Sequence, residues 1–165
     1  MRAIIIGGVA AGATAAARIR RLDEQAEIII VERGPYVSFA NCGLPYHISG
    51  AIEKRSKLLV QTPEGFMSRY RVEVLLNTEA TSIDRVNKQV TVETKTAGGS
   101  TTQQLSYDVL ILAQGGSPVF PPIEGIDAPH VYRLWTIPDM DKSIKHIKEQ
   151  APKSAVVIGG GFIGL

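Results

Sequence analysis

The chain opens with Ile4-Ile5-Ile6-Gly7-Gly8-Val9-Ala10-Ala11-Gly12-Ala13, an apolar run that leads into a glycine-rich turn. The run Arg2–Ile6 predicts a buried strand, and the Ala- and Arg-rich stretch Ala10–Glu24 predicts a helix. A second apolar run at Ile28–Glu32 predicts another buried strand. Strand, helix and strand together occupy about thirty residues, the usual length of a βαβ unit. The expected fold class is therefore α/β.

The glycine spacing of this unit indicates dinucleotide binding. Gly7 and Gly12 take the first and last positions of G-x-G-x-x-G, where they permit a tight turn and close helix–strand packing. Val9 replaces the middle glycine. A helix N-terminus offers N–H groups and a positive dipole end to a pyrophosphate, and Glu32 can bind ribose hydroxyls. A purely structural glycine cluster is the alternative. The predicted cofactor contacts here are Gly7, Gly8, Val9, Ala10, Ala11, Gly12, Glu32 and Arg33.

The same pattern recurs at the other end, where Val156–Gly164 repeats Ile4–Gly12. Gly159, Gly161 and Gly164 match the full spacing, which predicts a strand followed by a second glycine turn. Two such units suggest two dinucleotides, a flavin and a nicotinamide cofactor. The alternative is that residues 155–165 form only a terminal strand and tail. Because the helix that should follow the second turn is missing, we expect a piece of a longer protein.

The middle of the chain changes its hydrophobic period. Thr62-Pro63 predicts a helix start, with Thr62 as the N-cap. From Val72 to Leu105 apolar residues alternate with polar ones, which predicts an antiparallel meander inserted into the α/β domain. Val109–Leu112 is a continuous apolar run and predicts a buried parallel strand. Pro138–Gln150 predicts a further helix.

A break rich in glycine and proline suggests the domain boundary. Gly and Pro residues cluster at residues 115–123, where a regular element is disfavoured. We therefore expect an incomplete FAD-type domain over residues 1–118 and the truncated beginning of an NAD(P)-type domain over residues 119–165.

Composition and charge exclude several classes of protein. Of the 165 residues 44% are hydrophobic and 21% charged, a normal mix for a soluble globular domain. The formal net charge of +2 is too small to indicate a nucleic acid or membrane partner. No apolar run reaches about 18 residues, so no membrane span is predicted. Ala3–Ile6 is too short for a signal-peptide core, and we expect a cytoplasmic protein.

The single cysteine is the strongest candidate for chemistry. Cys42 lies in Ser38-Phe39-Ala40-Asn41-Cys42-Gly43-Leu44-Pro45-Tyr46, ten residues after Glu32. A lone cysteine is most often buried and inert. Here its neighbours are polar or turn-forming, and the segment lies where a Rossmann-like unit opens towards its ligand. One cysteine also excludes an internal disulfide and fits a reducing compartment. We expect a redox-active thiol that reacts with an external sulfur or oxygen.

The histidines do not suggest a metal centre. His130 and His146 have no Cys or His partner at ligand spacing, so no metal site is predicted. His47 follows Cys42 by five residues, where it can assist the thiol as a cation or serve a structural role, and the structural role is the commoner one. Trp135 is expected to pack in the core.

Two stretches resemble a known enzyme family. Tyr107–Gly115 resembles the second FAD-contact motif of the flavoprotein disulfide reductases with two dinucleotide domains, with Gln114 where the family has Thr. Ser38–Tyr46 resembles the active-site motif of their single-cysteine branch, which contains coenzyme A-disulfide reductase, persulfide reductase, NADH oxidase and NADH peroxidase. The resemblance runs over essentially all 165 residues and looks closest to the coenzyme A-disulfide and persulfide reductases.

The resemblance implies both a fold and a set of site residues. The fold is a Rossmann-like FAD-binding domain with an inserted antiparallel β-meander, plus the start of a second Rossmann-like NAD(P)-binding domain. Cys42 is the implied thiolate nucleophile facing the flavin. Asn41, Ala113 and Gly115 are implied cofactor contacts. The implied contacts to coenzyme A or to the reacting sulfur are Thr14, Arg18, Arg21, Ser38 and Asn41.

The arginines of the first helix have two interpretations. Arg18 and Arg21 are three positions apart and share a helix face, so they can meet the same phosphates. Alternatively, Arg18, Arg20 and Arg21 form a solvated basic face that suits a helix C-terminus. The residues alone leave both readings open, and the resemblance favours the phosphate contact.

The implied reaction runs in two halves. NAD(P)H reduces FAD, and reduced FAD resolves an adduct between Cys42 and the disulfide or persulfide of a small thiol such as coenzyme A. One alternative is an NADH oxidase or peroxidase in which Cys42 cycles through a sulfenic acid. The other is a catalytically inactive FAD-domain fragment. The resemblance also implies a homodimer for the full-length protein.

Overall fold

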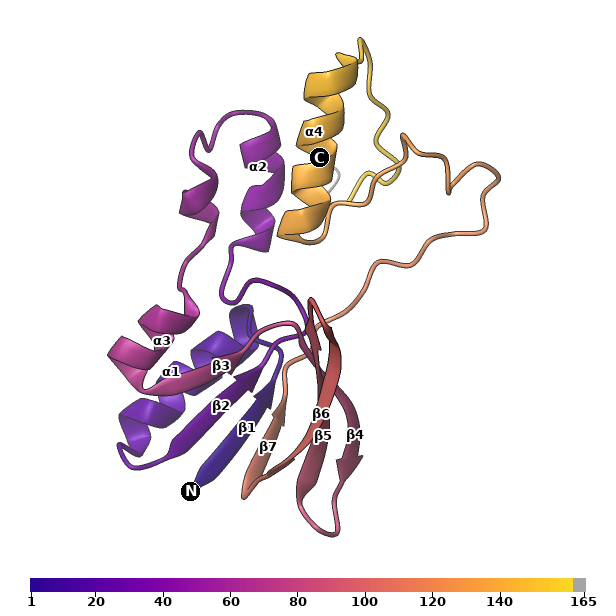
Figure 1. Ribbon diagram of the computed structural model, residues 1–165. Coiled ribbons are helices and arrows are strands. Elements are labelled where there is room, and N and C mark those ends of the chain that lie inside the picture. Colours follow the sequence, from indigo (N-terminus) through magenta and orange to yellow (C-terminus); the bar gives the residue numbers. More distant parts are fainter. Residues whose placement is uncertain (162–165) are drawn as a thin grey trace. The chain divides into compact units, whose positions relative to one another are not determined.

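The chain has the expected α/β fold class. Its structure is a computed structural model that describes residues 1–161. In chain order the elements are β1 (Arg2–Ile6), α1 (Ala10–Leu22), β2 (Glu27–Val31), the 3-10 helix η1 (Asn41–Gly43), α2 (Leu44–Ile48), the 3-10 helix η2 (Arg55–Leu58), α3 (Pro63–Tyr70), β3 (Val72–Leu75), β4 (Thr78–Asp84), β5 (Gln89–Thr96), β6 (Gly99–Ser106), β7 (Val109–Leu112) and α4 (Ile137–Gln150) (Figure 1).

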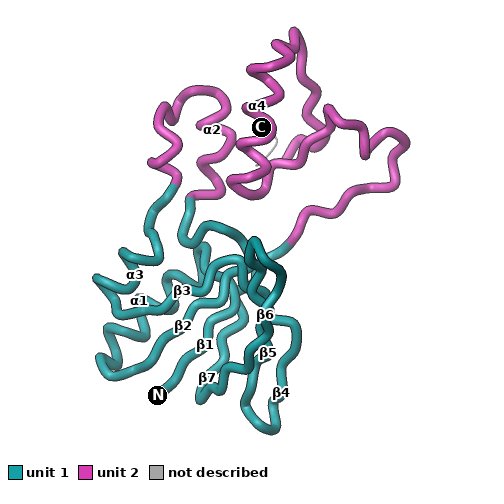
Figure 2. The backbone as a smooth tube through the Cα atoms, in the orientation of Figure 1, with its two compact units in different colours: residues 1–39, 59–116 teal, residues 40–58, 117–165 magenta. Residues whose placement is uncertain are grey.

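The chain divides into two compact units, which are described separately (Figure 2). Unit 1 comprises residues 1–39 and 59–116, and unit 2 comprises residues 40–58 and 117–161 of the described chain. Unit 1 therefore carries the first glycine turn, whereas the segment around Cys42 belongs to unit 2. The assignment of FAD and NAD(P) domains to residues 1–118 and 119–165 stays a prediction.

A parallel sheet forms the centre of unit 1, with the strand order β3-β2-β1-β7. Ile4 of β1 pairs with Ile29 of β2 and with Leu110 of β7, both in parallel register. The predicted βαβ unit is thus confirmed. Its helix is two residues shorter than expected, because the chain becomes extended at Asp23, whose N–H donates to the Ile19 carbonyl at 2.8 Å.

Each face of this sheet is covered by a different layer (Figure 1). On one face Ile5, Ile28 and Ile30 pack with Ala16 of α1 and Phe66 of α3. On the other face the alternate strand residues pack against Val90, Val92 and Leu105 of the meander. Because successive side chains of a strand point to opposite faces, the unbroken apolar runs of β1 and β2 serve both layers.

The predicted meander begins later than expected. Val72–Leu75 is β3, a strand of the parallel sheet that pairs with β2, so its inclusion in the meander was wrong. β3 lies at the end of the sheet order, and such a strand can alternate in burial like an antiparallel one. The antiparallel sheet itself has the order β4-β5-β6. Val86 lies exposed in the turn between β4 and β5 rather than in a strand.

β7 confirms one prediction and corrects another. Val109–Leu112 pairs in parallel with β1, as predicted. The expected burial is wrong, however, since Val109 is 41% and Leu112 57% exposed. Within the described residues β7 ends the sheet order, which leaves its side chains only one neighbouring strand to pack beside.

The second glycine turn departs furthest from expectation. The predicted strand at residues 155–158 is not formed, and Val156, Val157 and Ile158 are 89%, 67% and 71% exposed. A strand needs a hydrogen-bonding neighbour, and within residues 1–161 this stretch has none. Gly164 lies outside the described residues.

The helices outside the sheet follow the sequence signals. α3 begins after the N-cap Thr62, whose hydroxyl accepts from the Gly65 N–H at 3.1 Å, as predicted. α4 covers the predicted stretch and begins one residue earlier, at Ile137. No helix within residues 1–161 is long and apolar enough to cross a membrane.

Candidate cofactor and thiol sites

The first glycine turn is packed so closely that side chains are excluded. A Cβ on Gly12 would lie 1.8 Å from the Gly7 carbonyl oxygen, so α1 meets the end of β1 backbone to backbone. Gly7 has φ +96, and a Cβ there would lie 2.3 Å from the Ala113 carbonyl oxygen. The structure therefore confirms the predicted close packing at Gly12 and also brings Ala113 against Gly7. A side chain at Gly7 or Gly12 would collide with backbone atoms.

The backbone of the turn is held by hydrogen bonds from distant residues. The Gly7 N–H donates to the Val31 carbonyl at 2.8 Å, and the Ala113 N–H donates to the Ile6 carbonyl at 2.7 Å. The Gly8 carbonyl accepts from the Ser38 N–H at 2.8 Å. These bonds fix the path of the chain just before α1 begins.

The N-terminus of α1 keeps its donors for a ligand. Val9 is the N-cap, and among the described residues no side chain caps this end. The first turn of α1 also contains no acidic residue, and Ala10 and Ala11 are exposed. The first N–H groups of a helix have no partner within it, and they carry partial positive charge. This end of α1 is therefore suited to a pyrophosphate.

Glu32 lies beside the turn, directly after β2. It is 8% exposed, and its carboxylate accepts two backbone N–H groups. Oε2 accepts from Gly8 at 2.8 Å, and Oε1 accepts from Gly34 at 2.8 Å. Each carboxylate oxygen has a second acceptor position, which remains for a hydroxyl donor. Sequence reasoning found Glu32 but missed Gly34.

The donor set fits the adenosine diphosphate part of a dinucleotide. The uncapped helix end suits a pyrophosphate, and the buried carboxylate suits ribose hydroxyls. Two other predicted contacts, Arg33 and Gly115, are exposed, and Gly115 has φ +64. Gly115 lies two residues after Ala113, and a Cβ there would meet no atom within 4 Å.

The predicted substrate residues of α1 share one exposed face. Thr14, Arg18 and Arg21 are exposed and follow the i, i+4, i+7 spacing of a helix face. Arg21 also donates from Nε to its own helix, at the Ala17 carbonyl, 3.2 Å away. The face formed by these three residues is open to solvent and cationic. The solvated-face interpretation also included Arg20, and for that residue it is wrong.

Arg20, between these arginines, has a different role that the sequence did not reveal. Its guanidinium donates to five backbone carbonyls at 2.6–3.2 Å. The acceptors lie in the loop after α1 and at the turn between α3 and β3, namely Asp23, Glu24, Ala26, Tyr70 and Arg71. Arg20 therefore joins these two parts of unit 1. Its position two residues after Arg18 and directly before Arg21 gives no sign of this in the sequence.

Ser38 lies near the end of the unit 1 segment that leads towards Cys42. Its φ of +47 is in the left-handed region, which is uncommon for serine. Its carbonyl accepts from the N–H groups of Val60 at 2.8 Å and Gln61 at 3.3 Å, while its own N–H donates to Gly8. The structure thus gives Ser38 a backbone role, in addition to the predicted contact through its side chain.

Cys42 is exposed and lies in the middle of η1, in unit 2. Its N–H donates to Oδ1 of the preceding Asn41 at 3.1 Å. Gly43 follows and packs closely on Leu58, where a Cβ would lie 2.8 Å from Leu58 Cδ2 and would force that side chain to shift. The Ala40 N–H donates to the Leu58 carbonyl at 2.8 Å. The exposed thiol therefore sits on a backbone anchored by buried Leu58.

His47 has a structural role. Its Nδ1 lies 2.5 Å from the Ile52 carbonyl oxygen. A carbonyl only accepts, so Nδ1 carries the proton and donates it. This bond closes the loop after α2 and supports the commoner of the two interpretations of His47.

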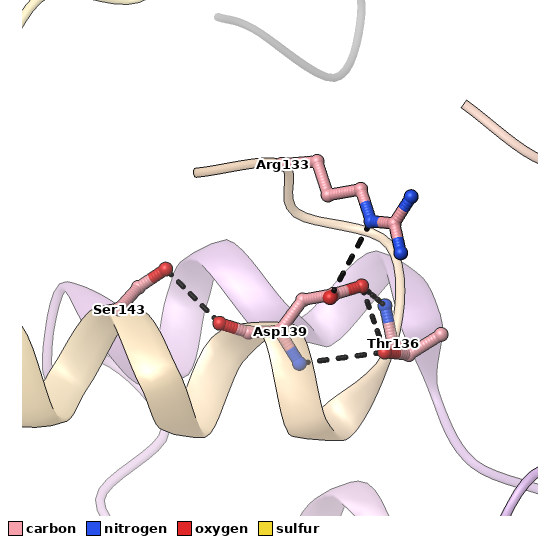
Figure 3. A network of polar contacts seen from close by, with 4 residues as sticks. All are labelled: Arg133, Thr136, Asp139 and Ser143. Atoms are coloured by element: carbon pink, nitrogen blue, oxygen red, sulfur yellow. Dashed lines mark hydrogen bonds and ion pairs between the residues drawn. The ribbon is translucent and has the colours of Figure 1, made fainter. Parts of the chain in front are cut away.

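α4 supports the cysteine segment within unit 2. α2 packs against α4, and Arg55 of η2 donates from Nε and Nη2 to the Asp141 carboxylate at 2.9 and 2.7 Å. α4 itself begins with a capping box, in which Thr136 and Asp139 bond each other (Figure 3). Arg133 adds an ion pair to Asp139 at 3.6 Å. Trp135, expected in the core, is half-buried.

A comparison with protein families identifies the chain. Residues 1–165 match the family described as pyridine nucleotide-disulphide oxidoreductase. The chain belongs to this family. The resemblance predicted from the motifs is therefore confirmed over the full length of the sequence.

Curated members of the pyridine nucleotide-disulphide oxidoreductases align with almost the entire chain. An NADH oxidase of Methanocaldococcus jannaschii is 35% identical over 165 residues, which is 100% of this chain and 36% of the relative. A coenzyme A disulfide reductase of Staphylococcus haemolyticus is 36% identical over 98% of this chain and 36% of the relative. The chain thus spans 36% of the length of these relatives.

Solved structures of relatives share the fold. Reduced Bacillus anthracis CoADR-RHD superimposes with a TM-score of 0.94 and 47% identity, covering 99% of this chain and 29% of that one. A NAD-dependent persulfide reductase from A. fulgidus gives a TM-score of 0.91 and 42% identity, covering 100% of this chain and 30% of that one. Both identities exceed those of the curated relatives above.

Proposed function

We propose that this chain is the FAD-binding and thiol-bearing part of a flavoprotein that uses NAD(P)H to reduce a coenzyme A disulfide or persulfide at Cys42. The observation that carries the proposal is the exposure of the chain's single thiol on η1. Membership of the pyridine nucleotide-disulphide oxidoreductases supports the redox chemistry. The names of the relatives support the substrate class.

The residues proposed to hold FAD lie around the first glycine turn. The N–H groups at the start of α1 would hold the pyrophosphate, and Glu32 would accept from ribose hydroxyls. When bound, FAD supplies the two-electron chemistry between the nicotinamide and the sulfur. NAD(P)H binding is proposed from the family and from Gly159, Gly161 and Gly164, of which the last lies outside the described residues.

Cys42 is the proposed nucleophile. Its thiolate Sγ attacks one sulfur of the substrate disulfide, the S–S bond breaks, and one coenzyme A leaves as a thiolate that takes up a proton. Cys42 is then bound to the second coenzyme A through a mixed disulfide. Two electrons, which bound FAD would supply from NAD(P)H, would break this S–S bond, so that Cys42 returns to the thiolate and the second coenzyme A leaves as a thiol after taking up a proton. The balance is one disulfide, one NAD(P)H and one proton giving two thiols and NAD(P)⁺.

The exposed face of α1 is the proposed contact for coenzyme A. Arg18 and Arg21 offer guanidinium groups that bind phosphates through paired hydrogen bonds, and Thr14 adds a hydroxyl one turn away. Arg20 is excluded from this role because its donors are used by backbone carbonyls. Ser38 and Asn41 are proposed contacts nearer the sulfur, on the segment that leads to Cys42.

Intact mass spectrometry of the denatured full-length protein tests this proposal. We expect a coenzyme A adduct that reductant removes and that Cys42→Ser abolishes, together with a bound-flavin spectrum of the native protein. Free cysteine in the absence of reductant, or irreversible over-oxidation, would count against the coenzyme A substrate. A native protein without flavin would refute the proposed FAD site.

A second candidate is an NADH oxidase or peroxidase. It is favoured by the Methanocaldococcus jannaschii relative of that name, and the exposed thiol is open to oxygen or peroxide. In this case Cys42 would carry a sulfenic acid between turnovers. Trapping with a sulfenic acid reagent such as dimedone, followed by mass measurement, would separate it from the first candidate.

A further inference from the structure

We propose that Glu32 shapes the pyrophosphate-binding turn as well as contacting the ribose, so that it is a positioning residue for the turn. The inference rests on the proposed FAD site and deepens it. Its basis is that both carboxylate oxygens are engaged within the protein itself, with the Gly8 and Gly34 N–H groups each at 2.8 Å.

Gly8 is held at both of its backbone polar groups. Its N–H donates to Glu32, and its carbonyl accepts from Ser38 at 2.8 Å. Gly8 is buried, and a Cβ there would lie 2.7 Å from Val37 and 2.8 Å from Ile30. In such a position the N–H has no access to water, so Glu32 is its acceptor in the folded protein. The next residue, Val9, is the N-cap of α1.

Glu32 also joins the turn to the loop that follows β2. Oε1 accepts from Gly34, and the Gly34 carbonyl accepts from the Asn77 N–H at 3.0 Å. The Glu32 backbone bonds Leu75 and Thr78, at 2.9 and 3.0 Å. The backbone of Glu32 is therefore fixed by hydrogen bonds. Its carboxylate binds the glycine turn through Gly8 and the loop after β2 through Gly34. A carboxylate that served only the ribose would not need two backbone donors.

The substitution Glu32→Gln separates the two roles. A glutamine keeps the size of the side chain but has one accepting oxygen and one donating nitrogen. The nitrogen would face a backbone N–H, so Gly8 or Gly34 loses its acceptor. Glu27→Gln is the matched control, because Glu27 begins β2, the strand that Glu32 follows, and its exposed carboxylate forms an ion pair with Arg2 at the surface.

The test uses the full-length protein with its flavin removed and two probes, ADP and 2′,3′-dideoxy-ADP, measured by calorimetry. Both have the pyrophosphate, and only ADP has the ribose hydroxyls. If Glu32 shapes the turn, Glu32→Gln weakens binding of the dideoxy probe by about tenfold or more, as expected for a lost charge-assisted bond. ADP is weakened at least as much, and Glu27→Gln changes neither probe.

Unchanged affinity for 2′,3′-dideoxy-ADP in Glu32→Gln would overturn the inference, because only the ribose contact would then depend on the carboxylate. Hydrogen exchange of the flavin-free wild-type protein provides a readout that needs no ligand and no variant. The Gly8 and Gly34 amides should exchange slowly, and rapid exchange at both would also refute the inference. If the wild type bound neither FAD nor ADP, the proposed function would fail, whereas the exchange result would still decide the role of Glu32 in the turn.

Discussion

The glycine turns at Gly7 and Gly159 share a backbone conformation but differ in their surroundings. Both glycines have a left-handed φ, +96 at Gly7 and +112 at Gly159. A Cβ on Gly7 would collide with Ala113, while a Cβ on Gly159 would meet nothing within 4 Å. The strand before Gly7 is buried between two neighbours, whereas Val156–Ile158 is exposed and unpaired within residues 1–161.

The two turns show which features a glycine-rich motif determines by itself and which features require partners elsewhere in the chain. A glycine-rich sequence determines the turn itself, because glycine alone enters this φ region at little cost. The strand and the close packing require partners distant in the sequence, which β2 and β7 supply to the first turn. The left-handed φ is therefore present at both first glycines, whereas the strand and the close packing are present only at the turn that has neighbouring strands.

The largest expected effect is at the buried turn. Gly12→Ala places a methyl group 1.8 Å from the Gly7 carbonyl, so α1 must move away from β1. We expect a loss of about 3–5 kcal/mol in the free energy of unfolding. Gly161→Ala, at the second turn, should change it by less than about 0.5 kcal/mol. Urea unfolding of both variants measures the difference, and equal effects would contradict the comparison.

The next effect concerns the helix that follows the first turn. Arg20→Ala removes the donors of five backbone carbonyls, and we expect a loss of about 2–3 kcal/mol. Arg18→Ala is the control on the same helix, and its exposed side chain predicts a change below about 0.5 kcal/mol. Thermal and urea unfolding should rank the two variants in this order. A reversed order would show that the carbonyls are satisfied without Arg20.

A smaller effect is expected in α4, the helix that leads to the second turn. A double-mutant cycle with Arg55→Ala and Asp141→Ala should give a coupling of about 0.5–1 kcal/mol, because the pair is bidentate but partly exposed. The exposed pair Lys145 and Glu149 on the same helix, 3.9 Å apart, should give less than about 0.5 kcal/mol. Equal couplings would mean that Arg55 and Asp141 add nothing to unit 2 beyond a surface pair.

The smallest effect lies in the meander β4-β5-β6, which covers β1. Hydrogen bonds from Asn87 lower the pKa of the Asp84 carboxyl below its ordinary value of 3.8. The backbone N–H of Asn87 has the larger effect and its side chain the smaller. Because the pKa is lowered, the charged Asp84 carboxylate stabilises the fold at pH values above the ordinary pKa. This contribution is lost as the pH falls through the pKa of the folded protein. NMR titration should show the low pKa, and Asn87→Ala should raise it part of the way back. An unchanged pKa in that variant would rule out the side-chain contact.

Much of unit 1 could be predicted from local signals. Ala3–Ile6 and Ile28–Val31 are unbroken apolar runs, and Thr62-Pro63 is a clear helix start, so these elements were found within one or two residues. β3 was misassigned because an edge strand of a parallel sheet alternates like a meander strand. Its partner, β2, lies more than forty residues earlier and leaves no local trace in the sequence.

The candidate site shows the same limit. The positions of Gly7, Gly12, Glu32 and Cys42 followed from spacing and from the resemblance. Three sets of hydrogen bonds could not be predicted: the Gly34 N–H to Glu32, the Ser38 N–H to Gly8, and the Arg20 guanidinium to the α3–β3 turn. They join backbone groups to residues whose types are common in loops and helices, so only the folded chain reveals them.

The pairing of β1 with β7 has a consequence for the time course of folding during synthesis. The Arg2 N–H donates to the Asp108 carboxylate, 106 positions later in the chain. At a translation rate of about 5–20 residues per second, roughly 5–20 s separate the emergence of the two strands. β4, β5 and β6 instead pair with their immediate neighbours and can close without delay. The nascent chain must therefore keep one side of the apolar strand β1 unpaired for seconds, until β7 has been synthesised.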